Sequence, residues 1–280
     1  MPSDLLRIQN QGSDPFNPER SAAPRLNILI VEDDDLNQRM INIMLRNTNH
    51  IIKFASNGID AIQSVTSEDF DLVFMDIQMP QMDGLETTRR IREWEKGEKH
   101  LLIIGMTAII DSAYGRCLQA GMDDIIPKPI DIKKFQGMIT ACANRKMNKT
   151  DTHAGDQPED FPVFDVEGAI KRFGGDRENY EILLKEFISS FSERFKELLA
   201  AWESNNWQRL SSHAHRLKGL SSNFGFMELS RKTFELEQYV NQGQFDRASQ
   251  KLDEMDISLN NLRSEVQAYL EKTTNDYRII

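Results

Sequence analysis

Three short segments in the first half of the chain consist almost entirely of apolar residues: 28–31, 72–75 and 101–104. Such runs are typical of strands that are buried on both faces of a parallel sheet. The predicted strands cover 27–31, 50–54, 71–75, 101–106 and 124–127, and amphipathic helical patterns alternate with them. Five strand–helix units in succession predict an α/β doubly wound five-stranded parallel sheet, which binds ligands at the carboxyl ends of its strands.

The second half of the chain has no strand pattern and instead carries four helical stripes of apolar residues. The stripes run from Leu184 to Trp202, from Trp207 to Phe224, from Leu229 to Val240 and from Phe245 to Tyr269. Long amphipathic helices with short connections predict an all-α antiparallel four-helix bundle.

Two segments, 1–24 and 145–164, are polar and lack an apolar period. We expect the first to be a disordered tail. The second reads as a flexible linker of about 20 residues, with an end-to-end reach on the order of 25 Å. The chain therefore divides into an α/β domain at 25–144 and a helical bundle at 165–274.

The chain carries 34 basic and 44 acidic side chains and a formal net charge of −10. Because nucleic-acid affinity comes largely from Lys and Arg neutralising phosphates, this balance argues against a nucleic-acid partner. The longest apolar stretch, Leu101–Ile110, is too short for a membrane span of about 20 residues, and no signal peptide precedes it. Two cysteines form neither a disulfide framework nor a metal cluster. We expect a cytoplasmic chain without membrane insertion.

Carboxylates follow two of the predicted strands: Glu32 and Asp33 after the first, and Asp76 after the third. Since the carboxyl ends of parallel strands meet at one edge of a sheet, these side chains are expected to lie close together. Three clustered carboxylates repel one another unless a cation lies among them, and oxygen ligands select a hard ion such as Mg²⁺. An alternative role for acidic residues here is to cap the next helix, as Asp34 or Asp35 could do.

A hydroxyl and an ammonium group end the fourth and fifth predicted strands, at Thr107 and Lys128. Together with Mg²⁺, these groups can spread the charge of a phosphoryl group as it moves. Asp76 would be the nucleophile, because a carboxylate can accept a phosphoryl group as an acyl phosphate. The pattern predicts a phosphoryl-transfer site at this edge of the sheet.

Residues 27–143 resemble the receiver domain of two-component response regulators, which has a flavodoxin-like fold. The matching segments are 28–34 (ILIVEDD), 71–80 (DLVFMDIQMP), 82–84 (MDG), 105–108 (GMTA), 121–124 (GMDD) and 128–129 (KP). The resemblance implies that Asp76 accepts phosphate from a phosphohistidine, while Thr107 and Lys128 bind the phosphoryl oxygens. It further implies that Mg²⁺ is held by Glu32, Asp33, Asp76 and the backbone carbonyl of Gln78.

Two positions near the fifth strand bear on how such a domain works. The family often has a cis peptide after this lysine, here between Lys128 and Pro129. Many receivers carry Tyr or Phe three residues before the lysine, where it swings inward on phosphorylation, but Ile125 takes that place here. A receiver that only passes phosphate onward does not need this switch.

Two histidines lie on the helix predicted near 207–224. His213 is placed roughly 60° from the centre of the apolar stripe, at the rim of the core, and His215 roughly 140° away, facing water. A neutral imidazole is a good nucleophile near pH 7, and Lys218 on the same face could steady phosphoryl oxygens. A glycine within a helix lowers stability by about 1 kcal/mol relative to Ala. The close approach of another surface would explain the presence of Gly219. The alternative is that both histidines are ordinary solvated or rim residues.

The segment 214–225 (AHRLKGLSSNFG) resembles the signature of histidine-containing phosphotransfer (HPt) domains, in which lysine and glycine follow the histidine at the third and fourth positions. In that family the motif lies on a four-helix bundle, and the helices from about Val166 to Lys272 fit this architecture. The resemblance implies that His215 is the phosphorylated residue.

Both resemblances concern the same chemical group, so the expected function is a phosphorelay in which Asp76 and His215 exchange a phosphoryl group. The expected partners are a histidine kinase and a downstream receiver or HPt protein. No kinase catalytic domain is visible, so the chain is expected not to be an enzyme in its own right. Its polar start at Met1 favours a complete chain; the alternative is the C-terminal part of a hybrid histidine kinase.

Two other functions compete with this one. In the first, the helical domain is a protein-interaction output of a response regulator, without phosphotransfer. In the second, the α/β domain is a Mg²⁺-dependent aspartyl-phosphate phosphatase. Such phosphatases usually place a second carboxylate two residues after the nucleophile, whereas Gln78 stands there in this chain.

Overall fold

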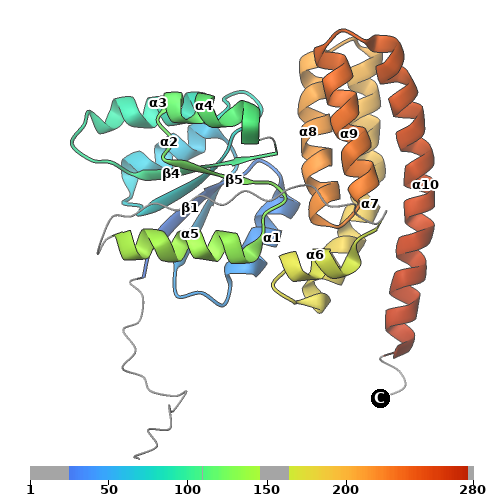
Figure 1. Ribbon diagram of the computed structural model, residues 1–280, viewed down its shortest axis with the longest axis horizontal. Helices are drawn as coiled ribbons and strands as arrows, with labels where there is room; N and C mark the ends of the chain where they lie inside the picture. The colour runs from blue at the N-terminus through green and yellow to red at the C-terminus, as the bar shows by residue number, and fades with distance from the viewer. Residues whose placement is uncertain (1–24, 109, 146–163, 277–280) are drawn as a thin grey trace, which may run out of the picture.

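The computed structural model describes residues 25–108, 110–145 and 164–276. The predicted tail at 1–24 and almost all of the predicted linker at 145–164 lie outside the described residues. The described residues form an α/β domain and a helical bundle that lie side by side (Figure 1).

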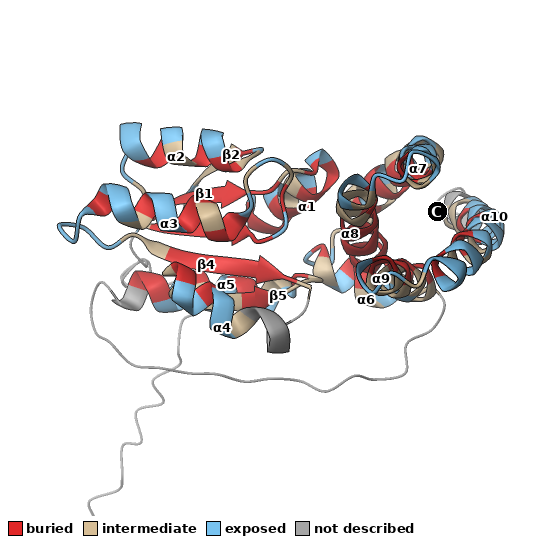
Figure 2. Ribbon diagram, turned by 90° about the horizontal axis from the view of Figure 1, so that it is seen from above, coloured by how far each residue is buried: buried red, intermediate tan, exposed pale blue. Residues whose placement is uncertain are grey.

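The predicted parallel sheet is confirmed. Its strands are β1 (Asn27–Val31), β2 (Ile51–Ala55), β3 (Leu72–Asp76), β4 (Leu102–Thr107) and β5 (Asp124–Pro127). They pair in the order β2-β1-β3-β4-β5, and every pair is parallel. All five residues of β3, the central strand, are buried, because helices cover both faces of the sheet. Figure 2 shows this buried layer in red between its flanking helices.

Five helices flank the sheet: α1 (Asp35–Leu45), α2 (Gly58–Ser67), α3 (Gly84–Glu95), α4 (Ile110–Ala120) and α5 (Ile132–Arg145). Figure 1 shows α1 and α5 on one face and α2, α3 and α4 on the other. Alternate side chains of β1 serve the two faces, since Ile28 and Ile30 pack with α1 and α5 while Leu29 and Val31 pack with the other helices. The Asp34 side chain accepts hydrogen bonds from two backbone N–H groups of α1, so the predicted cap at Asp34 or Asp35 is Asp34.

The predicted four-helix bundle is also confirmed. Its long helices are α7 (Arg177–Glu203), α8 (Trp207–Asn223), α9 (Met227–Asn241) and α10 (Phe245–Asp276). A further short helix, α6 (Val166–Arg172), precedes them. The predicted apolar stripes meet in a core rich in aromatic rings, in which Phe187 stacks on Phe224 with ring centroids 4.9 Å apart.

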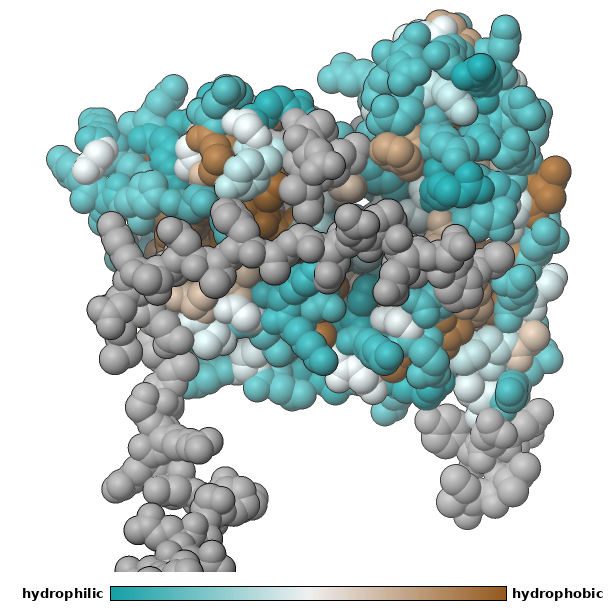
Figure 3. Space-filling view, viewed as in Figure 1, coloured by the Kyte–Doolittle hydropathy of each residue, from teal (hydrophilic) through white to brown (hydrophobic). Residues whose placement is uncertain are grey.

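The bundle lies at the carboxyl-end edge of the sheet, the edge at which the sequence predicts the reactive groups. Figure 2 shows the strand arrows pointing toward α8 and α6. On the face seen in Figure 3, hydrophilic side chains predominate on the bundle, and the apolar groups are confined to small areas. Among the described helices, none is both long and apolar enough to cross a membrane.

Candidate functional site

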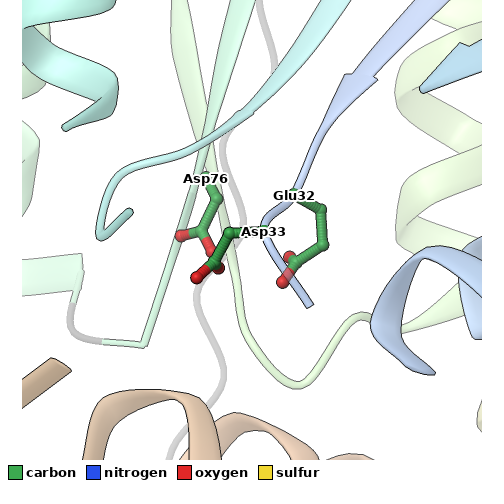
Figure 4. Close-up of side chains that lie close together, drawn as sticks. All are labelled: Glu32, Asp33 and Asp76. Carbon is green, nitrogen blue, oxygen red and sulfur yellow. The ribbon is translucent and has the colours of Figure 1, made fainter. Parts of the chain in front are cut away.

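Three carboxylates gather at the carboxyl ends of β1 and β3. Glu32 and Asp33 follow β1, and Asp76 is the last residue of β3. One oxygen from each lies within 4.8 Å of the others, and Figure 4 shows the three side chains extending from neighbouring strand ends to a common point. Glu32 and Asp76 are almost completely buried. The predicted acidic cluster therefore exists, and its members face one another rather than solvent.

Lys128, which follows β5, bridges two of these carboxylates. Its Nζ lies 2.8 Å from Glu32 Oε2 and 2.7 Å from Asp76 Oδ2. Burial by itself would lower the pKa of Lys128, but the charges of Asp76 and Glu32 outweigh burial and raise it, so the ammonium stays protonated. Thr107 is buried at the end of β4, and its backbone carbonyl accepts a hydrogen bond of 2.6 Å from the Lys128 N–H. All five residues that the strand pattern selected thus lie at one edge of the sheet.

The cluster holds more negative than positive charge. Burial raises the pKa of Glu32 to about 8. Burial also raises the pKa of Asp33 to about 6, and the charge of Asp76 adds to this increase. Both carboxylate oxygens of Asp33 are buried and have no hydrogen-bond partner among the described residues. A hard cation would offset this charge and bind the Asp33 oxygens, one of which also lies 3.2 Å from Arg216 Nε. The residues present therefore fit a divalent cation held by oxygen ligands.

Two further expectations concern the loops beside these carboxylates. The peptide between Lys128 and Pro129 is cis, as the resemblance implied. The backbone N–H of Gln78 donates a hydrogen bond of 3.1 Å to Asp76 Oδ1. This contact orients the loop after β3, while the role of the Gln78 carbonyl as a cation ligand stays a prediction. Ile125 packs beside the apolar cluster on the side of α4.

His215, on α8, is buried, with only 5% of its surface exposed. The expectation that it faces water is wrong, because the helix pattern reports only the direction away from the bundle core. Two elements cover that direction: α9, through Glu237, and the α/β domain, which contacts α8 on both sides of His215, at Arg216 and at Asn223.

Glu237 is a site residue that the sequence reasoning missed. Its Oε1 lies 3.7 Å from His215 Nδ1, too far for a hydrogen bond, and its Oε2 lies 3.4 Å from Lys218 Nζ. Burial opposes ionisation of Glu237, but its contacts with the imidazole and the ammonium group outweigh burial and lower its pKa. A signal was available: Glu237 lies within the inward-facing stripe of α9, together with Leu236 and Val240. A charge in such a stripe needs a partner.

Lys218 completes this second cluster. It is buried, and burial lowers its pKa while Glu237 opposes that change. The charges of Lys128 and Asp76, across the domain boundary, also act on the pKa of this ammonium group. Within the described residues no other surface approaches Gly219 closely, since a Cβ at that position would meet no atom beyond its own helix backbone within 4 Å.

His213 lies where the pattern placed it, half-buried at the rim of the bundle core. Its Nε2 accepts a hydrogen bond of 3.2 Å from Arg209, and its Nδ1 lies 3.5 Å from Glu197. Burial lowers the pKa of this imidazole. His213 is thus held by Arg209 of its own helix and by Glu197 of α7.

A cleft of about 730 Å³ lies between the α/β domain and the bundle. The loop after β3 and Thr107 form one wall, and α8 with His213, His215 and Arg216 forms the other. A residue of each predicted phosphoryl site, Thr107 and His215, therefore lines the same space.

Comparison with known families agrees with both halves of this geometry. Residues 28–140 match the family model of the response regulator receiver domain, and residues 182–268 match that of the Hpt domain. The chain is a receiver domain followed by an Hpt domain. The strand-end cluster belongs to the receiver, and the His215–Lys218–Glu237 cluster belongs to the Hpt domain.

Curated relatives of this chain include the sensor histidine kinase GacS of Pseudomonas protegens, which is 30% identical over 95% of this chain and 29% of its own length. The sensor histidine kinase RcsC of Escherichia coli is 32% identical over 54% of this chain and 17% of its own length. The chain thus spans less than a third of these relatives. Among solved structures, the receiver domain of a Pseudomonas aeruginosa sensor histidine kinase, with a coordinated magnesium ion, is 34% identical. It covers 43% of this chain and 99% of its own, with a TM-score of 0.40.

Receiver and Hpt domains in one chain, together with relatives among the sensor histidine kinases, identify a protein of phosphorelay signal transduction.

Proposed function

We propose that the chain carries a phosphoryl group on two residues in turn, Asp76 of the receiver and His215 of the Hpt domain. A histidine kinase partner would supply the group, and a downstream receiver or HPt protein would accept it. An acyl phosphate and a phosphoramidate are both reactive, so the same two sites can also run in the reverse direction. We further propose domain limits of 25–144 and 165–274, exchange in the cytoplasm, and no nucleic-acid partner.

The observation that carries this proposal is the position of Lys128 between Glu32 and Asp76, 2.8 Å and 2.7 Å from their oxygens. A buried ammonium at this distance neutralises the Asp76 carboxylate and can then follow the charge onto a phosphoryl oxygen. Thr107, buried at the neighbouring strand end, offers a hydroxyl to a second phosphoryl oxygen. Asp76 attacks phosphorus through a carboxylate oxygen, and the donor leaves with the bonding electron pair.

The acidic cluster supports a role for Mg²⁺ in this step. Glu32, Asp33, Asp76 and the Gln78 carbonyl would hold the ion, and the buried oxygens of Asp33, which have no hydrogen-bond partner among the described residues, are the observation that favours it. When bound, Mg²⁺ supplies positive charge that offsets the charge of the phosphoryl oxygens. Lys128 and Thr107 then need only to orient the phosphoryl group.

The contacts of His215 support its role as the second carrier. Glu237 faces Nδ1, which leaves Nε2 as the nitrogen that can attack phosphorus. The imidazole gains positive charge when Nε2 binds phosphorus, and the Glu237 carboxylate offsets that charge. Lys218 lies on the same side and can pair with the phosphoryl oxygens as they arrive. A bundle that served only as a docking output would have no need for this buried set of charges.

The test is labelling of the purified full chain with acetyl phosphate and Mg²⁺, followed by sorting of the label by its stability. Acyl phosphates are lost in alkali, whereas phosphoramidates survive alkali and are lost in acid. We expect an alkali-labile label in His215→Gln and no label of either kind in Asp76→Asn. The parent should carry both kinds, and His213→Gln should behave as the parent does. Alkali-stable label that persists in His215→Gln, or alkali-labile label in Asp76→Asn, would refute the assignments.

The chain is also proposed to act as an intermediate without kinase activity of its own, because neither matched family is a kinase catalytic domain. Incubation with ATP and Mg²⁺ alone should therefore leave both residues unlabelled. Addition of a histidine kinase should label Asp76 before His215. Label that appears with ATP alone in the purified chain would contradict this part of the proposal.

A further inference from the structure

Two arginines of the bundle contact the acidic loop that follows β1. Arg194 on α7 forms an ion pair with Asp34, and its second amino group lies 3.3 Å from Asp35. Arg216, the residue after His215, has its Nε 3.2 Å from Asp33 Oδ2. Asp34 is almost completely buried and Arg194 is mostly so, which reduces solvent screening of this pair. A pair of arginines on the bundle thus matches a run of carboxylates on the receiver.

Other contacts across the boundary surround His215 at greater distance. Arg39 on α1 pairs with Glu186 on α7 through both amino groups. Arg46 at the end of α1 pairs with Asp176, which caps α7. Along α7, Asp176 and Glu186 face arginines of the receiver, whereas Arg194 faces carboxylates. A receiver shifted along α7 from one pair to the next would therefore place like charges opposite each other.

A short chain of hydrogen bonds joins the bundle directly to the acidic cluster. Asn223 Nδ2 donates to Asn37 Oδ1 at 2.8 Å, and Asn37 Nδ2 donates to Glu32 Oε1 at 3.0 Å. On the other side of His215, Gln78 Nε2 lies 3.4 Å from Glu237 Oε1. Each cluster therefore contacts the opposite domain, and His215 lies between these two contacts.

We propose that phosphoryl transfer between Asp76 and His215 takes place within one chain, on a docking surface where Arg194 and Arg216 bind the acidic loop of the chain's own receiver. This inference rests on the proposed function and adds the partner: the receiver that this bundle serves first is the one joined to it. Arg194 acts here as a positioning residue, since it touches neither Asp76 nor His215.

The transfer step balances without any further reactant. The bond between phosphorus and the Asp76 carboxylate oxygen breaks, and its electron pair stays on the carboxylate. A bond between phosphorus and His215 Nε2 forms from the lone pair of that nitrogen. The proton on Nδ1 remains on the ring, where Glu237 faces it, so the total charge of the two sites is unchanged.

A tethered partner has a large kinetic advantage over one in solution. Two binding modules linked in one chain can meet at an effective concentration in the millimolar range, far above a working protein concentration of about 1 μM. The charge pattern decides the register of that encounter. A receiver on a second copy of the chain carries the same loop, so it is the natural competitor and forms one outcome of the test.

The first experiment separates transfer within a chain from transfer between chains. The parent at about 1 μM is compared with an equal mixture of Asp76→Asn and His215→Gln, in which only transfer between chains can label His215. We expect the mixture to transfer at least about ten-fold more slowly, and the parent rate to be independent of protein concentration. A mixture that equals the parent, or a parent rate proportional to concentration, would overturn the inference.

The second experiment tests the charge pattern. Arg194→Glu should slow transfer from Asp76 to His215 by about ten-fold or more and should leave acetyl phosphate labelling of Asp76 unchanged. Arg231→Glu, a matched reversal on α9 at a residue paired within its own helix, should leave transfer unchanged. An Arg194→Glu variant that transfers as fast as the parent would contradict the docking surface.

A charge exchange guards against a merely structural effect. Arg39→Glu and Glu186→Arg should each slow transfer, and the double variant should recover most of the parent rate, because the pair is restored with its polarity reversed. If the double variant does not recover the parent rate of transfer, the ion pairs do not determine how the two domains align. If Asp76 takes no label in the parent or in any variant, the proposed function itself fails. If Asp76 is labelled normally but His215 receives no label, only the transfer step fails.

Discussion

The strand-end cluster of the receiver and the histidine cluster of the bundle balance buried charge in different ways. The receiver gathers Glu32, Asp33 and Asp76 around one ammonium group, so its carboxylates outnumber its cations. The bundle places one carboxylate, Glu237, between an imidazole and an ammonium group, so its charges balance within the cluster. The carboxylates of the receiver site thus exceed the positive charge of its own ammonium group, whereas the bundle site balances its charges in the folded chain.

The largest effect that this difference predicts follows from Lys128→Met. Removal of the ammonium leaves the buried Asp76 carboxylate without its positive partner, which should lower the free energy of unfolding by about 3 kcal/mol at pH 7. Urea denaturation in the absence of divalent cations is the measurement. Saturating Mg²⁺ should recover part of the loss, because a ligand that binds only the folded state stabilises it.

Lys133→Met is the control for that substitution, since Lys133 lies on the same domain but is exposed on α5. It should change the free energy of unfolding by no more than about 0.5 kcal/mol. If Lys128→Met proves as stable as this control, the receiver cluster does not depend on Lys128, and the contrast between the two clusters is lost.

The second prediction concerns the balanced cluster. Glu237→Gln keeps the shape of the side chain but removes the charge that faces His215 and Lys218. Transfer to His215 should slow by about ten-fold, equal to about 1.4 kcal/mol, because the imidazole charge formed in the step is no longer offset. Glu235→Gln, two residues earlier on α9, is the matched control and should transfer as the parent does. Equal rates in both variants would show that Glu237 has no part in transfer.

The receiver site could be predicted from the sequence because strand pattern and topology together determine it. Lys128 and Glu32 are 96 positions apart, yet both directly follow a parallel strand. Parallel strands bring their carboxyl ends to one edge, so residue type and strand end were enough to place the whole cluster. The five strand positions differ from the predicted ones by a single residue or none at their starts.

The bundle site could be predicted only in part, because helix periodicity gives a direction relative to one core and no more. It correctly put His215 off the bundle core, but it could not show that α9 and the receiver would cover that side. Arg194 and Arg216 read as ordinary surface residues for the same reason. Their partners, Asp34 and Asp33, are about 160 and 180 positions away in another domain, where no periodic pattern connects them.

A third prediction tests the link between the two clusters. Asn223→Ala removes the hydrogen bond to Asn37, which itself binds Glu32. The loss should be about 1 kcal/mol of unfolding free energy, since the bond is buried and neutral. It should also slow transfer to His215 by less than ten-fold while acetyl phosphate still labels Asp76. Asn260→Ala, at an exposed residue that binds only within α10, is the control. A loss no greater than in this control would mean that the two clusters are not coupled through Asn37.

The smallest effect separates the two histidines of α8. Burial lowers the pKa of His213, so as the pH falls below about 6.5 the imidazole binds a proton in the unfolded chain before it does so in the folded chain. Protonation of the unfolded state therefore removes stability between pH 7 and pH 5, and His213→Gln abolishes that contribution. The difference in unfolding free energy between variant and parent should shift in favour of the variant by about 0.5 kcal/mol or less over this range. Urea denaturation of both proteins at pH 7 and pH 5 measures it, and the rate of transfer to His215 should be the same in both. A shift toward the parent at low pH would mean that His213 is charged in the folded chain. A loss of transfer in His213→Gln would mean that both histidines of α8 take part in the phosphoryl chemistry assigned to His215 alone.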